Sequence, residues 1–84
     1  MREKVLNVIQ RLFLEEQFLI FEGLSLNDKL QAMISESMLA LMLVTSLEDE
    51  FDIEFDDDEV DLDFFSDIFI VIDRTVKHIK ENEQ

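Results

Sequence analysis

The apolar positions near the start of the chain repeat every three to four residues. From Val5 they stand at i, i+3, i+4, i+7 and i+8, and polar residues fill most positions between them. This period gathers the apolar side chains on one face of an α-helix. The pattern therefore predicts a first amphipathic helix with an apolar face of Val5, Val8, Ile9, Leu12 and Phe13.

A second helix is predicted over residues 37–51, and it is more apolar than one buried face requires. No residue from Met38 to Val44 is polar. On a helical wheel one set of side chains faces the core with Phe51, namely Ala40, Leu43, Val44 and Leu47. The remaining apolar side chains are left partly outward, and they are Met38, Leu39, Leu41 and Met42.

A third helix is predicted over residues 67–80. Its apolar face comprises Ile68, Ile72, Val76 and Ile79. The apolar run from Ile68 to Ile72 could form a strand by itself, but Ser66 is a suitable N-cap and the helical period continues beyond the run.

The long connection between the first two helices, residues 18–36, is expected to cross the bundle as a loop. Four apolar residues are spaced to hold it on the core: Leu24, Leu26, Leu30 and Met33. A short helical turn is expected over residues 57–61. Residues 1–84 are thus predicted to form one small all-α domain, a bundle of three main helices plus one short helix. The predicted core is Val5, Ile9, Leu12, Leu43, Leu47, Phe51, Ile68, Ile72, Val76 and Ile79.

Acidic residues dominate the charge of the chain. Twenty-one Asp and Glu face seven Lys and Arg, which gives a net charge of −14, and no basic residue lies between Lys29 and Arg74. Such a surface repels nucleic acid and anionic membranes, so we expect neither as a partner, and basic protein surfaces instead. The acids also keep an apolar chain soluble. The sequence has no cysteine, no leader and no apolar stretch of about 20 residues, so we expect a cytoplasmic protein. We also expect a monomer.

Catalytic residue combinations are missing from the sequence. The one histidine, His78, falls in the last turn of the last predicted helix, where a cation is stabilised by the helix dipole, so we interpret it as structural. No cysteine or second histidine can complete a dyad or triad, and Gly23 stands alone. We therefore expect no enzymatic activity.

The acidic stretch of residues 48–63 invites comparison with a calcium-binding EF-hand loop. Counted from Asp52, acids fall at loop positions 1, 3 and 5, but Asp57 occupies position 6, where glycine is needed, and Asp63 replaces the glutamate of position 12. We therefore expect no dedicated metal site, although weak divalent binding by clustered carboxylates stays open.

Ser37 lies where the long connection ends and the apolar helix begins. A hydroxyl at this position can cap the helix, and spacing alone favours that role. The same position suits a phosphate ester, because free backbone N–H groups and the positive end of the helix dipole stabilise an anion. No base neighbours the hydroxyl in the sequence, so another enzyme would have to modify it.

Four segments resemble the acyl carrier protein family, and the similarity covers nearly the whole chain. Residues 47–55, LEDEFDIEF, are similar to the LEEEFDIEI segment that ends the family's second helix. Glu36-Ser37-Met38 then falls on the family's DSL motif, whose serine carries 4′-phosphopantetheine. Residues 26–30 resemble the end of the family's long first loop, and residues 65–68 resemble the entry to its last helix.

This resemblance implies a carrier protein with 4′-phosphopantetheine on Ser37, attached by a phosphopantetheinyl transferase. Cargo would be held as an acyl or aminoacyl thioester, and loading and processing enzymes with basic docking patches would do the chemistry. Fatty acid, polyketide and nonribosomal peptide pathways all stay open. Two departures from the family occur: Glu36 replaces aspartate, and Ile34 stands where glycine is common. If that position needs a positive φ, isoleucine would be strained there and the loop would take a different shape. The transferase would then be specialised for this chain, or the modification would be lost.

Within this reading, a docking face is predicted beside the site. Met38 and Met42 would form its apolar part, Glu48 and Asp49 its rim, and Glu36 would meet the transferase. Leu41 is counted among the docking residues, although of the outward apolar side chains it is also the one expected to cover the crossing loop. Methionines suit a surface that repacks against several partners, and acids steer a basic partner.

Two alternatives from other classes of function stay open. One is an unmodified, carrier-like acidic adaptor that binds basic proteins. The other is an acidic mimic of nucleic acid, which would spread its acids along an elongated face, whereas here they gather after the second predicted helix.

Overall fold

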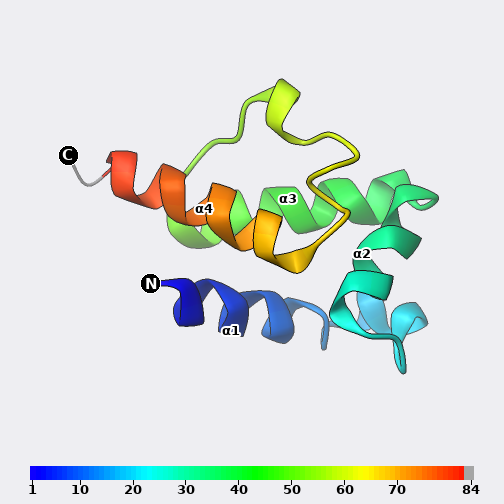
Figure 1. Ribbon diagram of the computed structural model, residues 1–84. Coiled ribbons are helices and arrows are strands. Elements are labelled where there is room, and N and C mark those ends of the chain that lie inside the picture. The colour runs from blue at the N-terminus through cyan, green and yellow to red at the C-terminus, as the bar shows by residue number, and fades with distance from the viewer. Residues whose placement is uncertain (83–84) are drawn as a thin grey trace.

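The computed structural model describes residues 1–82, which form four α-helices and two short 3₁₀ helices and contain no strand (Figure 1). The α-helices are α1 (Arg2–Leu12), α2 (Leu26–Ile34), α3 (Ser37–Phe51) and α4 (Ile68–Asn82), and the 3₁₀ helices are η1 (Glu16–Phe21) and η2 (Asp57–Glu59). The all-α class and the three main helices of the sequence prediction are confirmed.

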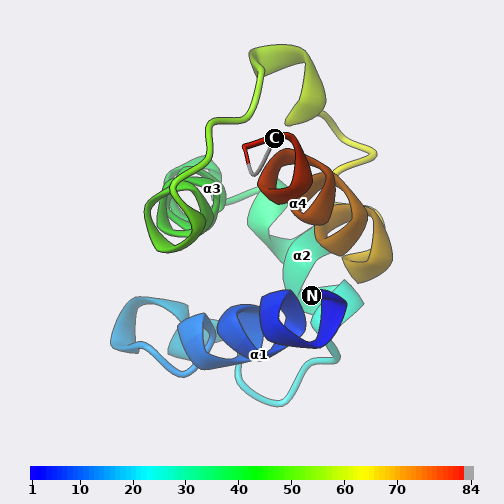
Figure 2. The same ribbon diagram turned by 90° about the vertical axis from the view of Figure 1, so that its left-hand side faces the viewer.

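The connection between the first and second predicted helices is itself largely helical, so the expectation of a crossing loop is wrong. It contains η1 and the nine-residue helix α2. The Ser25 hydroxyl caps α2 by accepting the N–H of Asp28 at 3.2 Å, which satisfies one of the free N–H groups of the first turn. Figures 1 and 2 show α2 crossing one end of the bundle, while α1, α3 and α4 run along its length.

The core agrees with the predicted apolar faces. Every predicted core residue is buried except Phe51, which is half-buried. In the connection, Leu30 and Met33 are fully buried, whereas Leu24 is exposed, contrary to expectation. Aromatic side chains from the connections add to the core: Phe13, Phe18, Phe21, Phe55, Phe64 and Phe65.

The start of α4 is capped differently from the prediction. The Ser66 hydroxyl donates to the carbonyl of Asp63 at 2.7 Å and so does not cap the helix. Instead the Asp67 carboxylate accepts the N–H of Phe69 at 2.8 Å, and the side chain of Asn27 in α2 accepts the N–H of Ile68 at 2.7 Å. Helix α2 therefore fixes where α4 begins.

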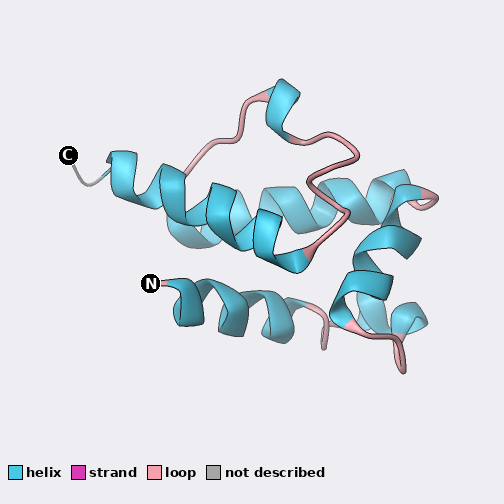
Figure 3. Cartoon of the chain, viewed as in Figure 1, coloured by secondary structure: helices cyan, strands magenta, loops and turns pink. Residues whose placement is uncertain are grey.

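The segment between α3 and α4 arches over these two helices on the side facing away from α1, as both ribbon views show (Figures 1 and 2). Figure 3 shows loop backbone on both sides of the short helix η2. Asp52 ends α3 with φ 54° and ψ 50°, and it is the only non-glycine residue with a positive φ in residues 1–82.

None of the helices within residues 1–82 combines the length and the apolar character that a membrane crossing requires.

Candidate functional site

Ser37 is the first residue of α3, and its side chain is exposed. The N-cap position belongs to Glu36, which makes no side-chain cap hydrogen bond. Among residues 1–82 the Ser37 hydroxyl has no hydrogen-bond partner, so the capping role that spacing favoured is wrong. The backbone N–H groups at the start of α3 have no partner within residues 1–82 until Ala40. The N–H of Ala40 donates to the carbonyl of Glu36 at 3.1 Å.

The turn before Ser37 distinguishes it from the neighbouring serine. Ser35 caps the C-terminus of α2, and its hydroxyl donates to the carbonyl of Ala32 at 2.9 Å. Ile34 is the last residue of α2 and has no positive φ. Ile34 is therefore not strained, and of the two serines only Ser37 has a free hydroxyl.

An open groove of about 530 Å³ lies beside Ser37, between the N-terminal half of α3 and the segment that leads to α4. Its size is in the range of about 300–1,000 Å³ that is common for small-molecule sites. Ser37 and Asp61 are its polar lining residues. The others are apolar: Ile34, Ala40, Leu41, Val60, Leu62 and Phe65.

Exposed leucines from two elements flank this groove. Leu41 of α3 is 65% exposed and Leu62 is 69% exposed. The expectation that Leu41 covers the crossing segment is therefore wrong, because it faces the groove instead. Sequence reasoning also missed Val60 and Leu62, which have no helical period and reach the groove only through the folded path of the chain.

The apolar residues of the predicted docking face differ in their exposure to solvent. Met38 is 76% exposed, whereas Met42 is half-buried and packs against the core. Since Leu41 is also exposed, the outward apolar surface of α3 consists of Met38 and Leu41. The start of α3 is therefore apolar toward solvent on the same stretch of helix that carries Ser37.

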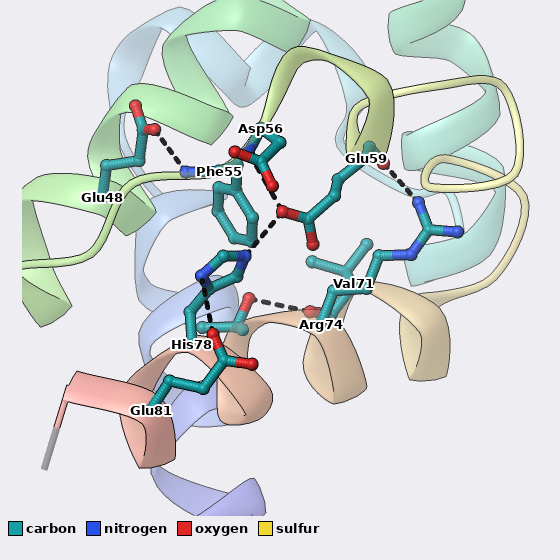
Figure 4. Close-up of polar contacts among 9 residues, drawn as sticks. Glu48, Phe55, Asp56, Glu59, Val71, Arg74, His78 and Glu81 are labelled. Atoms are coloured by element: carbon teal, nitrogen blue, oxygen red, sulfur yellow. Dashed lines mark hydrogen bonds and ion pairs between the residues drawn. The ribbon is translucent and has the colours of Figure 1, made fainter. Parts of the chain in front are cut away.

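The two predicted rim acids have different environments. Glu48 is half-buried, and its carboxylate accepts the N–H of Phe55 at 2.9 Å (Figure 4). It thereby holds the chain that leaves α3 through Asp52. Asp49 is exposed, as is Glu36 at the other end of the helix. Of the acids predicted to take part in docking, Asp49 and Glu36 are therefore the two that are exposed to a partner.

The groove wall opposite α3 is fastened to α4 by polar contacts (Figure 4). Nε2 of His78 lies 2.6 Å from Oε1 of Glu59, and Arg74 donates to the backbone carbonyl of Glu59 and, at 3.1 Å, to the carboxylate of Asp61. The sequence predicted a solvated, structural His78, and the first part is wrong, because its side chain is only 15% exposed and contacts Glu59. Its role is to hold a distant segment.

These contacts change the acidity of both carboxyl groups. Burial acts to raise the pKa of Glu59, but hydrogen bonds from the Asp56 N–H and from His78, with the positive charges of His78 and Lys77, outweigh it and lower the pKa. At Asp61 the N–H of Phe64 and then Arg74 lower the pKa. Both groups are therefore anions at neutral pH.

The acids of residues 48–63 do not converge. Within the described part of the chain, no three His, Cys, Asp or Glu side chains are placed to hold one metal ion.

Comparisons of the chain with protein families, with characterised proteins and with solved structures found no match. A function must therefore be argued from the residues and the geometry of the chain itself.

Proposed function

We propose that this chain is a carrier protein that holds intermediates as thioesters on a 4′-phosphopantetheine arm attached to Ser37. The observation that carries the proposal is the free hydroxyl of Ser37 at the start of α3, at the edge of an apolar groove. The neighbouring Ser35 lacks this freedom because its hydroxyl is bound to Ala32. The motif resemblance around Glu36-Ser37-Met38 supports the same residue.

The residues around Ser37 suit a phosphate ester. The first turn of an α-helix has backbone N–H groups without intrahelical partners, and the helix dipole adds positive potential. In α3 this turn begins at Ser37 itself, so an ester on its oxygen would lie next to these groups. Within residues 1–82 no side chain is hydrogen-bonded to the hydroxyl as a base would be, so the transferase would take its proton.

The arm would supply a thiol, which the chain lacks because it has no cysteine. The chain's own contribution would be to present and shelter the cargo. The groove is lined by apolar side chains such as Leu41, Leu62 and Phe65. Burying apolar surface there would stabilise an uncharged acyl chain, whereas a charged aminoacyl group would lose hydration without gaining a partner. This favours acyl cargo.

Partner enzymes would approach the exposed start of α3. Met38 and Leu41 offer apolar contact there, with Glu36 at the helix start and Asp49 farther along the helix. With a net charge of −14, the chain would attract enzymes whose docking surfaces are basic. Those enzymes would load and process the cargo.

Coexpression with a broad-specificity phosphopantetheinyl transferase, followed by peptide mass spectrometry, tests the proposal. We expect the adduct on Ser37 in the wild type and in the matched control S35A, and none in S37A. A wild-type chain that stays unmodified, or an S37A chain that gains the adduct, would refute the proposal.

The alternative function is an unmodified acidic adaptor for basic proteins. The replacement of the family's aspartate by Glu36 favours it, because the transferase recognises that position in the related carriers. The intact mass of the protein isolated from its native source separates the two functions, since an adaptor would carry no adduct.

A further inference from the structure

Residues 56–63, which we name the strap, form one wall of the groove and also contact α4. Val60, Asp61 and Leu62 of the strap line the groove. Glu59 contacts His78 and Arg74 of α4 (Figure 4). Asp61 also contacts Arg74. Whatever changes the contact between the strap and α4 therefore acts on the groove wall.

The strap has little else to hold it. Its only regular structure is the three-residue helix η2. Its acids repel one another: Asp56, Asp57, Asp58, Glu59, Asp61 and Asp63. Val60 is half-buried against the core, and Leu62 is exposed. Apart from Val60, attachment therefore depends on His78 and Arg74, which lie one helical turn apart on α4 and so face the same direction.

His78 contacts the oxygen atom that organises the strap. Oε1 of Glu59 accepts the backbone N–H of Asp56 at 3.0 Å and lies 2.6 Å from Nε2 of His78. The same carboxylate thus closes the turn of η2 and joins it to α4. The His78 and Glu59 side chains are 15% and 22% exposed. Solvent therefore screens their interaction less than it screens a surface pair.

The charged groups around His78 are mostly acidic. Glu59 faces it from the strap, and Glu81 of its own helix lies 4.0 Å away. Asp52 and Glu54, from the chain that follows α3, line a shallow hollow together with His78. The nearby cations are Arg74, whose guanidinium is bound to the strap, and Lys77, which acts on Glu59. A positive imidazole is therefore paired with Glu59 and has the further acids Glu81, Asp52 and Glu54 nearby.

We propose that His78 is a pH-sensitive latch: when protonated, it fastens the strap to α4 and fixes the groove wall beside Ser37, and when neutral it lets the wall loosen. Imidazole side chains change charge between about pH 8 and pH 5. A hydrogen bond between two charged groups is roughly twice as strong as one between neutral groups. Arg74 keeps its charge throughout, so the strap loosens without leaving α4. The latch does not depend on modification of Ser37.

An NMR titration of the labelled chain between about pH 8.5 and pH 5 tests the latch. Because His78 is the only histidine, its imidazole signals are unambiguous. We expect the methyl signals of Val60 and Leu62 to shift with the same midpoint as the imidazole. The Glu59 amide bonds to the carbonyl of Asp56 at 2.9 Å. We expect the protection factor of this amide, which is the exchange rate of an unstructured chain at the same pH divided by that of the amide, to be about 2- to 10-fold higher at pH 6 than at pH 8.

H78Q is the matched variant, because glutamine keeps a donor and has no charge to gain. In H78Q the signals of Val60 and Leu62 should not follow pH, and E81Q, which alters an exposed acid 4.0 Å away, should behave like the wild type. Strap signals that respond to pH equally in H78Q and the wild type would overturn the latch. If H78Q does not fold, the wild-type titration decides alone: an imidazole that titrates while Val60 and Leu62 do not respond overturns the proposal as well.

Discussion

The helical bundle and the strap are stabilised by different interactions. The core contacts of α1, α3 and α4 are apolar, and side chains such as Val5, Leu43 and Leu47 are fully buried. The strap is acidic and is attached by a few polar contacts to α4. Apolar burial is insensitive to pH, whereas ion pairs depend on pH and salt. The difference implies that the groove beside Ser37 has one rigid wall, α3, and one adjustable wall, the strap.

The largest expected effect is in the bundle. Leu47 is fully buried, so Leu47→Ala should lower the free energy of unfolding by about 3–5 kcal/mol. At the stability per residue that is usual for small domains, a chain of this length has only about 4–13 kcal/mol in total. Urea unfolding followed by circular dichroism measures the change.

The control for this prediction is Leu41→Ala. Leu41 is exposed, and its truncation should change stability by less than about 0.5 kcal/mol. Equal effects of the two substitutions would contradict the assigned core.

A smaller effect is expected when the strap is detached. Glu59→Gln removes the charge that meets His78. It should cost about 1.5–3 kcal/mol, the contribution of a hydrogen bond to a charged group. Asp58→Asn removes the same charge from the adjacent exposed residue. It should be neutral or slightly stabilising, because it reduces the repulsion within a chain of net charge −14. If the two variants unfold at the same urea concentration, Glu59 does not hold the strap.

As the pH is lowered from neutral, the stability of the folded chain should first rise and then fall. Mild acidification and added salt should first stabilise the chain, because they reduce the repulsion of an excess of acids. The pKa of Glu59 is lowered by folding from its ordinary 4.5. Its contribution is therefore complete above that value and is lost as pH falls through the folded pKa.

Melting temperatures across pH therefore should rise and then fall in the wild type, and the fall should be shallower in Glu59→Gln. A wild-type melting temperature that keeps rising at the acidic end, or an identical fall in the variant, would contradict this assignment. A melting temperature that does not change with salt would show that charge repulsion is unimportant.

The same contrast explains how far the sequence could predict the structure. The helices α1, α3 and α4 were predictable because their apolar periods are local. Helix α2 was missed although Leu26, Leu30 and Met33 have helical spacing, because it has only nine residues and its cap, Ser25, was not recognised. Ser37 was predicted to be the attachment residue from the resemblance of its motif, which stays a prediction, and its predicted position at a helix start is confirmed.

The strap side of the site could not be predicted, because distant residues set its position. Glu59 meets His78 from 19 residues away, and Asn27 caps α4 from 41 residues away. Neither contact follows from a local period. The groove needs both walls, so its strap residues, such as Leu62, became visible only in the folded chain.

The smallest stability effect is expected at the exposed start of α3, and two methionines of this helix can be compared. Met42 packs against the core, so Met42→Glu should destabilise the chain by about 1–3 kcal/mol, because a charge there loses hydration. Met38 is 76% exposed. Met38→Glu should therefore leave the melting temperature unchanged, as surface substitutions usually do.

If Met38 contacts partner enzymes, Met38→Glu should still slow modification of Ser37. A contact residue contributes about 1–2 kcal/mol, so kcat/KM of a broad-specificity phosphopantetheinyl transferase should fall about 5- to 30-fold. Asp49→Asn should instead lower the rate of Ser37 modification at low salt and change it little at high salt. The reason is that an exposed acid speeds the encounter with a basic partner, and salt screens this attraction. An unchanged rate for Met38→Glu, with Ser37 still modified, would leave Ser37 as the attachment site and place the docking surface elsewhere than on the exposed start of α3.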